Sequence, residues 1–373
     1  MSCKRILSPV CAALALTLCL SGCGDSQEAA ASVTPQPLPT ASAAPTLSPT
    51  ATPDPTPTPY DGPENPLTGM PIDGDAVNKR PVAIMLNNLK QALPQLGQSE
   101  ADIIYECLAE GGITRMLGVY QDPSDVGAIG SIRSARPYYL ELALGHDAIF
   151  IHAGGSEDAY ADIRAWGVTA LDGVNGPYCG SSPGSNLMWR DADRRRNLGY
   201  EHSVITTGET IEEKFATYSF RQEHKDGYTY PITFADDGTP ENGSTANTIT
   251  VPFSNYKTGV FTYDADSGTY LVEEYGAPYV DGNTGDQVAV TNVLVVQTSC
   301  WNTGDSYGHM EVDLTGTGSG YYACGGQIIP IRWSKPDRNS PFTYTDENGQ
   351  PIVLGRGSSY VNIIPKSEQV TAE

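Results

Sequence analysis

The sequence predicts an α+β protein with two folded domains, a mixed α/β domain over residues 64–240 and a mostly β domain over residues 241–368. Three observations support this prediction. Residues 1–63 have the composition of a signal peptide and a disordered linker, which leaves ~310 residues for the fold, a length that suits two domains. Short apolar runs alternate with helix-like segments as far as about residue 234. From about residue 245 to residue 365, the pattern is almost wholly that of β-strands separated by turn residues.

Residues 1–22 are typical of an export signal. Two cations precede an apolar run of 15 residues, Ile6–Leu20, which is short for the ~20 residues that a membrane-spanning helix needs. The run ends in Leu20-Ser21-Gly22-Cys23, which resembles the lipobox of bacterial lipoproteins, where the cysteine receives a diacylglycerol and becomes the mature N-terminus. A chance cysteine in an ordinary signal peptide is the alternative. We expect acylated Cys23 to anchor the protein in the lipid bilayer, on the extracytoplasmic face of the bacterial cell membrane.

A linker rich in proline, threonine, serine and alanine follows over residues 23–63. Such a segment cannot bury enough apolar surface to fold, and its prolines keep it extended. At ~3.1 Å per residue, its reach is on the order of 100 Å. We expect the linker to hold the folded part away from the bilayer.

The chain is strongly acidic, with a formal net charge of −22. Removal of the signal peptide takes away Lys4 and Arg5 and no acid, which brings the charge from −22 to −24. An acidic body is repelled by nucleic acid and by anionic lipid, so we expect neither as a partner. The charge is also uneven, because Lys257 is the only lysine or arginine between Asp226 and Gly325, where 13 acids lie.

The first domain is expected to open with a buried strand over Pro81–Leu86. A hairpin follows, with arms over Ile103–Ala109 and Ile113–Tyr120 around Glu110-Gly111-Gly112, and a short helix over residues 101–109 is the alternative for its first arm. Proline suits the first turn of a helix, so Pro137 indicates a helix that continues to Leu144.

The rest of the first domain continues with a strand over Asp147–His152. Ser156 is expected to cap a helix that reaches about Trp166, and a last helix is expected over Thr210–Tyr218. For the second domain we expect a long apolar strand over Val288–Thr298 and several hairpins. Two of these hairpins surround the turns at residues 264–268 and 346–349, and the whole is expected to form a small sandwich or an open barrel.

Four cysteines follow the expected lipid anchor, namely Cys107, Cys179, Cys300 and Cys324. Disulfides persist outside the cytoplasm, and four cysteines allow three connectivities. We favour a Cys300–Cys324 disulfide, because these residues are expected on nearby strands, and four free thiols are the alternative. The spacing of cysteine and histidine does not indicate a zinc site, so we expect no metal and no cofactor.

The densest group of chemically active side chains lies in the first domain. It comprises Glu106, Glu110, Arg115, Arg133, Arg136 and His152. Arginines 133 and 136 come just before a helix, where guanidinium groups and free backbone N–H groups hold carboxylates or phosphates well. The alternative is an internal ion network in which Arg133 and Arg136 pair with Glu106 and Glu110.

Two further features have both a functional and a structural interpretation. His152 ends a strand and precedes a helix, which is where α/β sheets commonly bind ligands, but a satisfied and partly buried histidine is the more common case. Arg190 and residues 194–196 alternate with acids, which favours a solvated face of paired charges over an anion site. Neither a serine nucleophile elbow nor a phosphate-binding GxxxxGK[ST] loop is present.

A set of motifs from about Asn65 to Pro365 resembles the signature of the YerB-like bacterial lipoprotein family. The motifs are residues 80–88 (RPVAIMLNN), 101–106 (ADIIYE), 110–115 (EGGITR), 130–136 (GSIRSAR), 152–156 (HAGGS), 344–349 (YTDENG) and 357–365 (GSSYVNIIP). The resemblance implies a two-domain envelope lipoprotein of unknown function, and it supplies no catalytic residue. The four cysteines of the folded part do not belong to this signature.

Two functions are consistent with the sequence. The first is a tethered binding or scaffold protein of the cell envelope, whose ligand, a cell-wall fragment or another envelope protein, contacts residues among Asn87, Glu106, Arg115, Arg133, Arg136 and His152. The second is a hydrolase or transferase of envelope glycan or phosphodiester, with Glu106 or Glu110 as acid/base, His152 as a second proton carrier, and Arg133 and Arg136 neutralising charge. We prefer the binding protein, because the sequence lacks a complete catalytic constellation.

Overall fold

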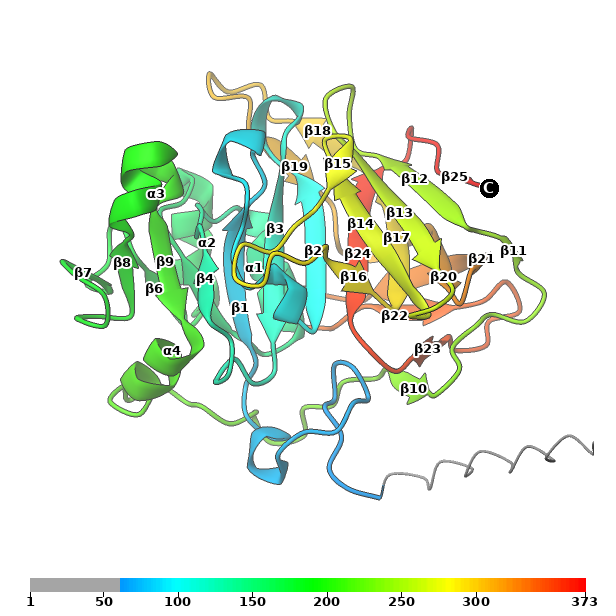
Figure 1. The fold of residues 1–373 in the computed structure, drawn as a ribbon, viewed down its shortest axis with the longest axis horizontal. Coiled ribbons are helices and arrows are strands. Elements are labelled where there is room, and N and C mark those ends of the chain that lie inside the picture. Colours follow the sequence, from blue (N-terminus) through cyan, green and yellow to red (C-terminus); the bar gives the residue numbers. More distant parts are fainter. Residues whose placement is uncertain (1–60) are drawn as a thin grey trace, which may run out of the picture. The chain divides into compact units, whose positions relative to one another are not determined.

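The structure is a computed structural model that describes residues 61–373. The expected signal peptide, the lipidation site Cys23 and the linker up to residue 60 lie outside the described residues. Figure 1 shows the order of the elements along the chain. The fold class is confirmed, because a strand-rich second half follows a first half in which strands and helices alternate.

An eleven-stranded sheet runs through both predicted domains, in the order β11-β21-β20-β17-β24-β2-β3-β1-β5-β6, with β22 beside β21. Its strands are β1 (Val82–Asn87), β2 (Ile103–Leu108), β3 (Thr114–Tyr120), β5 (Ile149–His152), β6 (Ala170–Asp172), β11 (Ser244–Thr245), β17 (Asn292–Thr298), β20 (Gly316–Cys324), β21 (Gln327–Lys335), β22 (Thr343–Thr345) and β24 (Ser359–Pro365). β24 comes from the end of the chain and lies parallel between β2 and β17, so the sheet joins the two halves.

The first half contributes a hairpin and three parallel strands to this sheet. β2 and β3 pair in antiparallel register around a 3-10 turn at Glu110–Gly112, which confirms the predicted hairpin and rules out the alternative helix. β1, β5 and β6 run parallel, so their carboxyl ends lie at one edge of the sheet. Loops that follow the carboxyl ends of such strands are the usual ligand-binding edge of an α/β sheet.

The helices of the fold do not all lie on one face of this sheet. They are α1 (Pro137–Gly145), α2 (Glu157–Trp166), α3 (Ala192–Asn197) and α4 (Gly208–Phe215), with short 3-10 helices η1 (Gly74–Ala76), η2 (Lys90–Ala92), η3 (Gln98–Glu100), η4 (Glu110–Gly112) and η5 (Tyr200–His202). α1 begins at its proline and α2 follows the cap Ser156, whose side chain accepts a hydrogen bond from Ala159 N, both as predicted. α4 contributes Ile211 and Phe215 to the core around Val82, whereas residues of α1 share the core on the other face with Met85 and Leu117.

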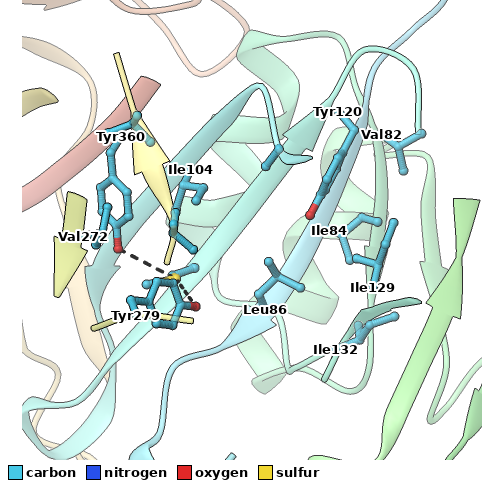
Figure 2. Close-up of a cluster of buried hydrophobic side chains, with 14 of the residues drawn as sticks. Val82, Ile84, Leu86, Ile104, Tyr120, Ile129, Ile132, Val272, Tyr279 and Tyr360 are labelled. Carbon is cyan, nitrogen blue, oxygen red and sulfur yellow. Dashed lines mark hydrogen bonds between the residues drawn. The ribbon is translucent and has the colours of Figure 1, made fainter. Parts of the chain in front are cut away.

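A second, six-stranded sheet covers the opposite face. It has the order β15-β14-β13-β12-β25, with β16 beside β14, and its strands are β12 (Thr248–Pro252), β13 (Thr258–Asp264), β14 (Thr269–Glu274), β15 (Ala277–Pro278), β16 (Ala289–Val290) and β25 (Thr371–Ala372). The rings of Phe261 and Tyr360 meet edge to face, with 5.0 Å between their centroids. The hydroxyl groups of Tyr279 and Tyr360 lie 3.3 and 3.9 Å from the sulfur of Met116, and Figure 2 shows these two tyrosines in the core. The strands of the second half thus form packed sheets, but the larger sheet also contains strands of the first half, so they do not form the separate small sandwich or open barrel that was expected.

Three small sheets complete the fold. They contain β4 (Ala128–Gly130), β7 (Cys179–Gly180), β8 (Met188–Arg190) and β9 (Val204–Thr207) in the order β4-β9-β8-β7, then β10 (Thr233–Ala235) with β23 (Val353–Gly355), and β18 (Cys300–Asn302) with β19 (Met310–Val312). No helix among residues 61–373 is long and apolar enough to cross a membrane.

Three of the predicted elements differ in the structure. The apolar run at residues 288–298 is two strands, because the chain leaves the smaller sheet after Val290 and joins β24 from Asn292. The last helix begins two residues early, at Gly208, because Thr207 caps it, and its first turn holds Glu209. The turn at residues 346–349 is present and its arms pair beside it through the antiparallel bridge Thr345–Pro351, but beyond this bridge they diverge, β22 to β21 and β23 to β10.

The favoured Cys300–Cys324 disulfide is wrong, because all four cysteines among the described residues have free thiols. The register of the large sheet explains this result. Ala323 lies opposite Val293, so Cys324 is near the start of β17, whereas Cys300 follows the end of β17. The length of a seven-residue strand, ~23 Å, separates these two places, and the Cα atoms of a disulfide lie within ~7 Å.

Candidate functional site

Glu106 lies in the core of the protein rather than in a groove. Its side chain is fully buried on β2, on the face that the smaller sheet covers. One carboxylate oxygen accepts hydrogen bonds from Asn88 Nδ2 at 2.8 Å and from the hydroxyl of Thr114 at 2.5 Å. The other accepts one from the hydroxyl of Tyr360 at 2.5 Å. These donors satisfy the carboxylate internally and leave it no contact with solvent.

Lys257 is the cation that compensates this buried acid. Its Nζ lies 3.1 Å from Glu106 Oε1 and also contacts the carboxylate of Glu274, and none of the three side chains is exposed. Burial lowers the pKa of Lys257, and the charge of Glu106 acts against that shift. A buried pair of this kind contributes little relative to an apolar core, but the loss of one partner costs several kcal/mol because a bare charge remains. We call Glu106, Lys257, Glu274 and Tyr360 the core ion cluster.

Glu110 forms a separate ion cluster with two of the predicted arginines. Its carboxylate contacts Arg115 and lies 2.8 Å from Nη2 of Arg136. Burial acts to raise the pKa of Glu110, but the two guanidinium groups outweigh it and hold the pKa below the ordinary value. Burial lowers the pKa of Arg115 to about 10, and the neighbouring Arg136 acts in the same direction. Arg136 therefore pairs with Glu110, as predicted for the internal network. Among the described residues, Glu106 pairs with Lys257 and forms no ion pair with Arg133 or Arg136.

The sheet itself separates the residues of the hypothetical enzyme. Successive side chains of a strand point to opposite faces, and Glu106 shares the face of Ile104 while Cys107 points to the helices. Asn87 is buried as well, with Nδ2 2.8 Å from His202 Nδ1 and its oxygen bound to Leu89 N. The structure therefore does not bring Glu106, Glu110 and His152 together at one cleft.

His152 lies at the carboxyl end of β5, beside an open pocket. This His152 pocket, of about 680 Å³, is lined by His152, Glu157, Tyr160, Ile163, Arg164, Ala170, Asp172, Asn175, Gly176 and Tyr178. The imidazole Nδ1 is 2.8 Å from the carbonyl oxygen of Gly154 and 4.0 Å from Asp172. Burial lowers the pKa of His152, although Gly154 and Asp172 act against the shift. The ring is therefore neutral at neutral pH.

Arg133 lies beside a second pocket. This arginine pocket, of about 370 Å³, is lined by Ile132, Arg133, Ser134, Ala153, Gly154, Gly155, Val174, Asn175, Arg190, Tyr200, Glu201 and Val204. The backbone of Arg133 is fixed between two strands, because its N–H donates to Met85 O and its carbonyl accepts from Ala153 N. Its Nη2 is 2.8 Å from Glu201, an exposed acid, and its Nε is buried without a hydrogen-bond partner among the described residues.

Arg190 reaches the same pocket from the end of β8. Its guanidinium lies 3.6 Å from the ring centroid of Tyr200. Its Nη1 donates to Tyr200 O at 2.7 Å and to the hydroxyl of Ser203 at 3.3 Å. Residues 194–196 were expected to form a solvated face with Arg190, but they differ in burial and in their partners. Arg194 is buried and donates to three backbone carbonyls, whereas Arg196 is exposed beside Asp193.

The two pockets are neighbours at the carboxyl ends of β1, β5 and β6, and Asn175 lines both. Of the residues predicted to form a site, His152 and Arg133 line pockets, and Asn87, Glu106, Glu110, Arg115 and Arg136 have internal partners. The sequence interpretation missed Asp172, Arg190 and Lys257 as members of these groups. Lys257 had a usable signal, since a single cation among 13 acids is a candidate for an internal ion pair.

Comparison with known proteins places the chain in a family. Residues 67–221 match the model "Protein of unknown function (DUF3048) N-terminal domain", and residues 249–361 match the C-terminal domain of the same family. The chain is 31% identical over 305 residues to the Bacillus subtilis protein "Putative lipoprotein YerB", which covers 80% of this chain and 86% of that protein. A crystal structure of YerB protein from Bacillus subtilis is similar in fold, with a TM-score of 0.69, 27% identity, and coverage of 83% of this chain and 99% of the other. The resemblance found in the sequence motifs is thus confirmed, and the chain belongs to the DUF3048, or YerB-like, family.

Proposed function

We propose that the protein is a membrane-anchored extracytoplasmic lipoprotein of the cell envelope whose folded part binds an anionic ligand in the arginine pocket. The observation that carries the binding proposal is the presence of two arginines at one pocket with N–H groups still available. Among the described residues, Glu201 accepts a hydrogen bond only from Nη2 of Arg133. Backbone and serine oxygens accept hydrogen bonds only from Nη1 of Arg190. Guanidinium forks of this kind bind carboxylates and phosphates through charge-assisted hydrogen bonds.

The electrostatics of the protein support an anion rather than a neutral ligand in this pocket. The chain carries a net charge of −22, and most of its surface therefore repels anions. In the arginine pocket the charge is positive on balance, because two cations, Arg133 and Arg190, line it with one exposed acid, Glu201. Nη1 of Arg133 has no hydrogen-bond partner among the described residues and is not buried, so it can donate to an anion in the pocket.

Equilibrium titration with orthophosphate and with acetate at constant ionic strength tests the binding proposal. A hydrogen bond to a charged group contributes ~1.5–3 kcal/mol, so Arg133→Gln and Arg190→Gln are each expected to weaken binding by roughly 10- to 100-fold. Arg196→Gln is the matched control, because Arg196 is exposed and pairs only with Asp193. No saturable binding of either anion, or equal losses in all three variants, would overturn the proposal.

The anchoring proposal rests on different observations. They are the Leu20-Ser21-Gly22-Cys23 motif, the apolar run before it, and the similarity to a protein that carries the name lipoprotein. We expect growing bacteria to incorporate labelled palmitate into the wild-type chain, and Cys23→Ala to abolish the label and to release the protein from the membrane fraction. An unlabelled wild-type chain in the cytosolic fraction would contradict this part of the proposal.

A further inference from the structure

The His152 pocket is separate in chemistry from the arginine pocket beside it. Its walls come from the carboxyl ends of β5 and β6, from the α2 side chains Tyr160, Ile163 and Arg164, and from the loop after β6. Its volume of about 680 Å³ lies within the ~300–1,000 Å³ that is usual for small-molecule sites. Nothing in the anion-binding proposal uses these walls.

The imidazole of His152 lines this pocket and has one nitrogen that acts as a hydrogen-bond acceptor. Gly154 O can only accept, so the contact at 2.8 Å places the proton of the neutral ring on Nδ1. Nε2 is then left with a free lone pair, and no described residue donates a hydrogen bond to it. The side chain is only 1% exposed, and the ring of Phe150 stacks against it with 5.2 Å between centroids. Because this buried ring lines the pocket, the acceptor is available to a donor from a ligand.

Asp172 fixes the pocket, and protein donors occupy both of its carboxylate oxygens. One oxygen accepts from Gly154 N and Val174 N at 2.8 Å, and the other accepts from the hydroxyl of Tyr160 at 2.6 Å. Asn175 Nδ2 in turn donates to the same hydroxyl at 2.6 Å. With Asn175 N, at 3.1 Å, the carboxylate accepts hydrogen bonds from four protein donors. Such an acid orients its neighbours and attracts a cation weakly.

The remaining groups select a neutral ligand that both donates and accepts hydrogen bonds. Glu157 and Arg164 at the rim carry opposite charges, and an anionic ligand would also meet the charge of Asp172. The acceptor of His152 requires an O–H or N–H donor, while Arg164 offers N–H groups to an oxygen. Tyr178 and Ile163 add apolar surface, against which the C–H face of a ring can pack. A hydroxyl-rich ring is the chemical group that meets all three requirements.

We propose that the His152 pocket is a saccharide-binding site, in which a sugar hydroxyl donates to Nε2 of His152 and the sugar ring packs against the aromatic and aliphatic wall. The proposal is independent of the arginine pocket, so either site can be present without the other. A peptide is the competing ligand class, because an amide N–H can also donate to His152. The free carboxylate of a short peptide would be repelled by Asp172 and Glu157, which favours the saccharide.

Titration of the full chain with N,N′-diacetylchitobiose and maltose, followed by calorimetry and saturation-transfer NMR, tests this site. His152→Phe keeps an aromatic ring but removes the acceptor, and it is expected to weaken saccharide binding at least tenfold. Tyr178→Ala is a second variant at the half-buried wall, in case His152→Phe is unstable. The matched controls are His309→Phe and Tyr256→Ala, whose side chains do not line the pocket and are expected to leave binding unchanged.

The outcomes separate this site from the arginine pocket. Arg133→Gln is expected to weaken orthophosphate binding and to leave saccharide binding unchanged. His152→Phe is expected to weaken saccharide binding and to leave orthophosphate binding unchanged. Failure of both saccharides to bind the wild type, binding of trialanine in preference to them, or equal losses in the control variants would each overturn the saccharide proposal. None of these results would bear on the titration with orthophosphate.

Discussion

Lys257 Nζ lies 3.1 Å from Glu106 Oε1, and both side chains are completely buried. The two residues come from opposite halves of the chain, because Glu106 belongs to β2 and Lys257 precedes β13 of the smaller sheet. Their contact therefore joins the large sheet to the sheet that covers it. Glu274 on β14 shares the same ammonium group, so one cation neutralises acids from two sheets.

Lys257→Met is expected to destabilise the protein by ~3–5 kcal/mol, because it leaves the carboxylates of Glu106 and Glu274 buried without a cation. Chemical denaturation followed by circular dichroism measures the free energy of unfolding. Glu106→Gln with Lys257→Met removes both charges of the pair and is expected to cost clearly less than the sum of the single changes. Additive losses would show that the pair is not coupled.

Glu110→Gln is expected to reduce the sensitivity of the fold to acid. The pKa of Glu110 is lower in the folded protein than its ordinary value of 4.5, because Arg115 and Arg136 outweigh the effect of burial. Its contribution to stability is therefore present above about pH 4.5 and is lost as the pH falls through the lower, folded value. Between pH 5 and pH 3, unfolding free energies should fall less steeply in Glu110→Gln than in the wild type. Glu347→Gln, in an exposed turn, serves as the control, and identical slopes in all three proteins would refute the role of Glu110.

The contribution of Asp102 to the free energy of unfolding depends on pH in the opposite direction to that of Glu110. Burial raises its pKa from 3.8 to about 6, although Gln121 N and Asn65 Nδ2 donate hydrogen bonds to it. Its contribution to stability is complete below about pH 3.8 and is lost as the pH rises through about 6. The shift of about two units corresponds to up to ~3 kcal/mol.

Asp102→Asn therefore should gain stability relative to the wild type as the pH rises from 4 to 8, by up to ~3 kcal/mol. Denaturant titrations at a series of pH values measure this difference, with Asp125→Asn, a nearby exposed residue, as the control. A difference between Asp102→Asn and the wild type that stays constant over this range would contradict the raised pKa.

Local patterns were sufficient to predict the elements that local forces determine. The strand β1, the hairpin β2–β3 and the helices α1 and α2 follow from apolar runs, a proline in the first turn and a serine cap. The break at Thr291 could not be predicted in this way. Residues 288–298 are one apolar run, and the change from the smaller sheet to the large one depends on partners, β14 and β24, that are distant in sequence.

The same limit applies to the sites. A strand end followed by a helix indicated His152, and arginines before a helix indicated Arg133, and both residues line pockets. The sequence could not show that Glu106 and Glu110 have different partners. They are only four residues apart, but in the structure they lie on opposite faces of the sheet, Glu106 beside Lys257 and Glu110 beside Arg136. The sequence could not assign Arg190 to the pocket of Arg133. Arg190 reaches that pocket because β8 pairs with β9, and this pairing is not visible in the sequence.

Crystals of the protein grown with selenate would test the binding proposal most directly, since the anomalous signal of selenium locates the anion. We expect a selenium peak within hydrogen-bonding distance of both Arg133 and Arg190, and its absence in Arg133→Gln. An empty arginine pocket at a selenate concentration that saturates binding in solution, with the anion bound elsewhere, would contradict the proposal.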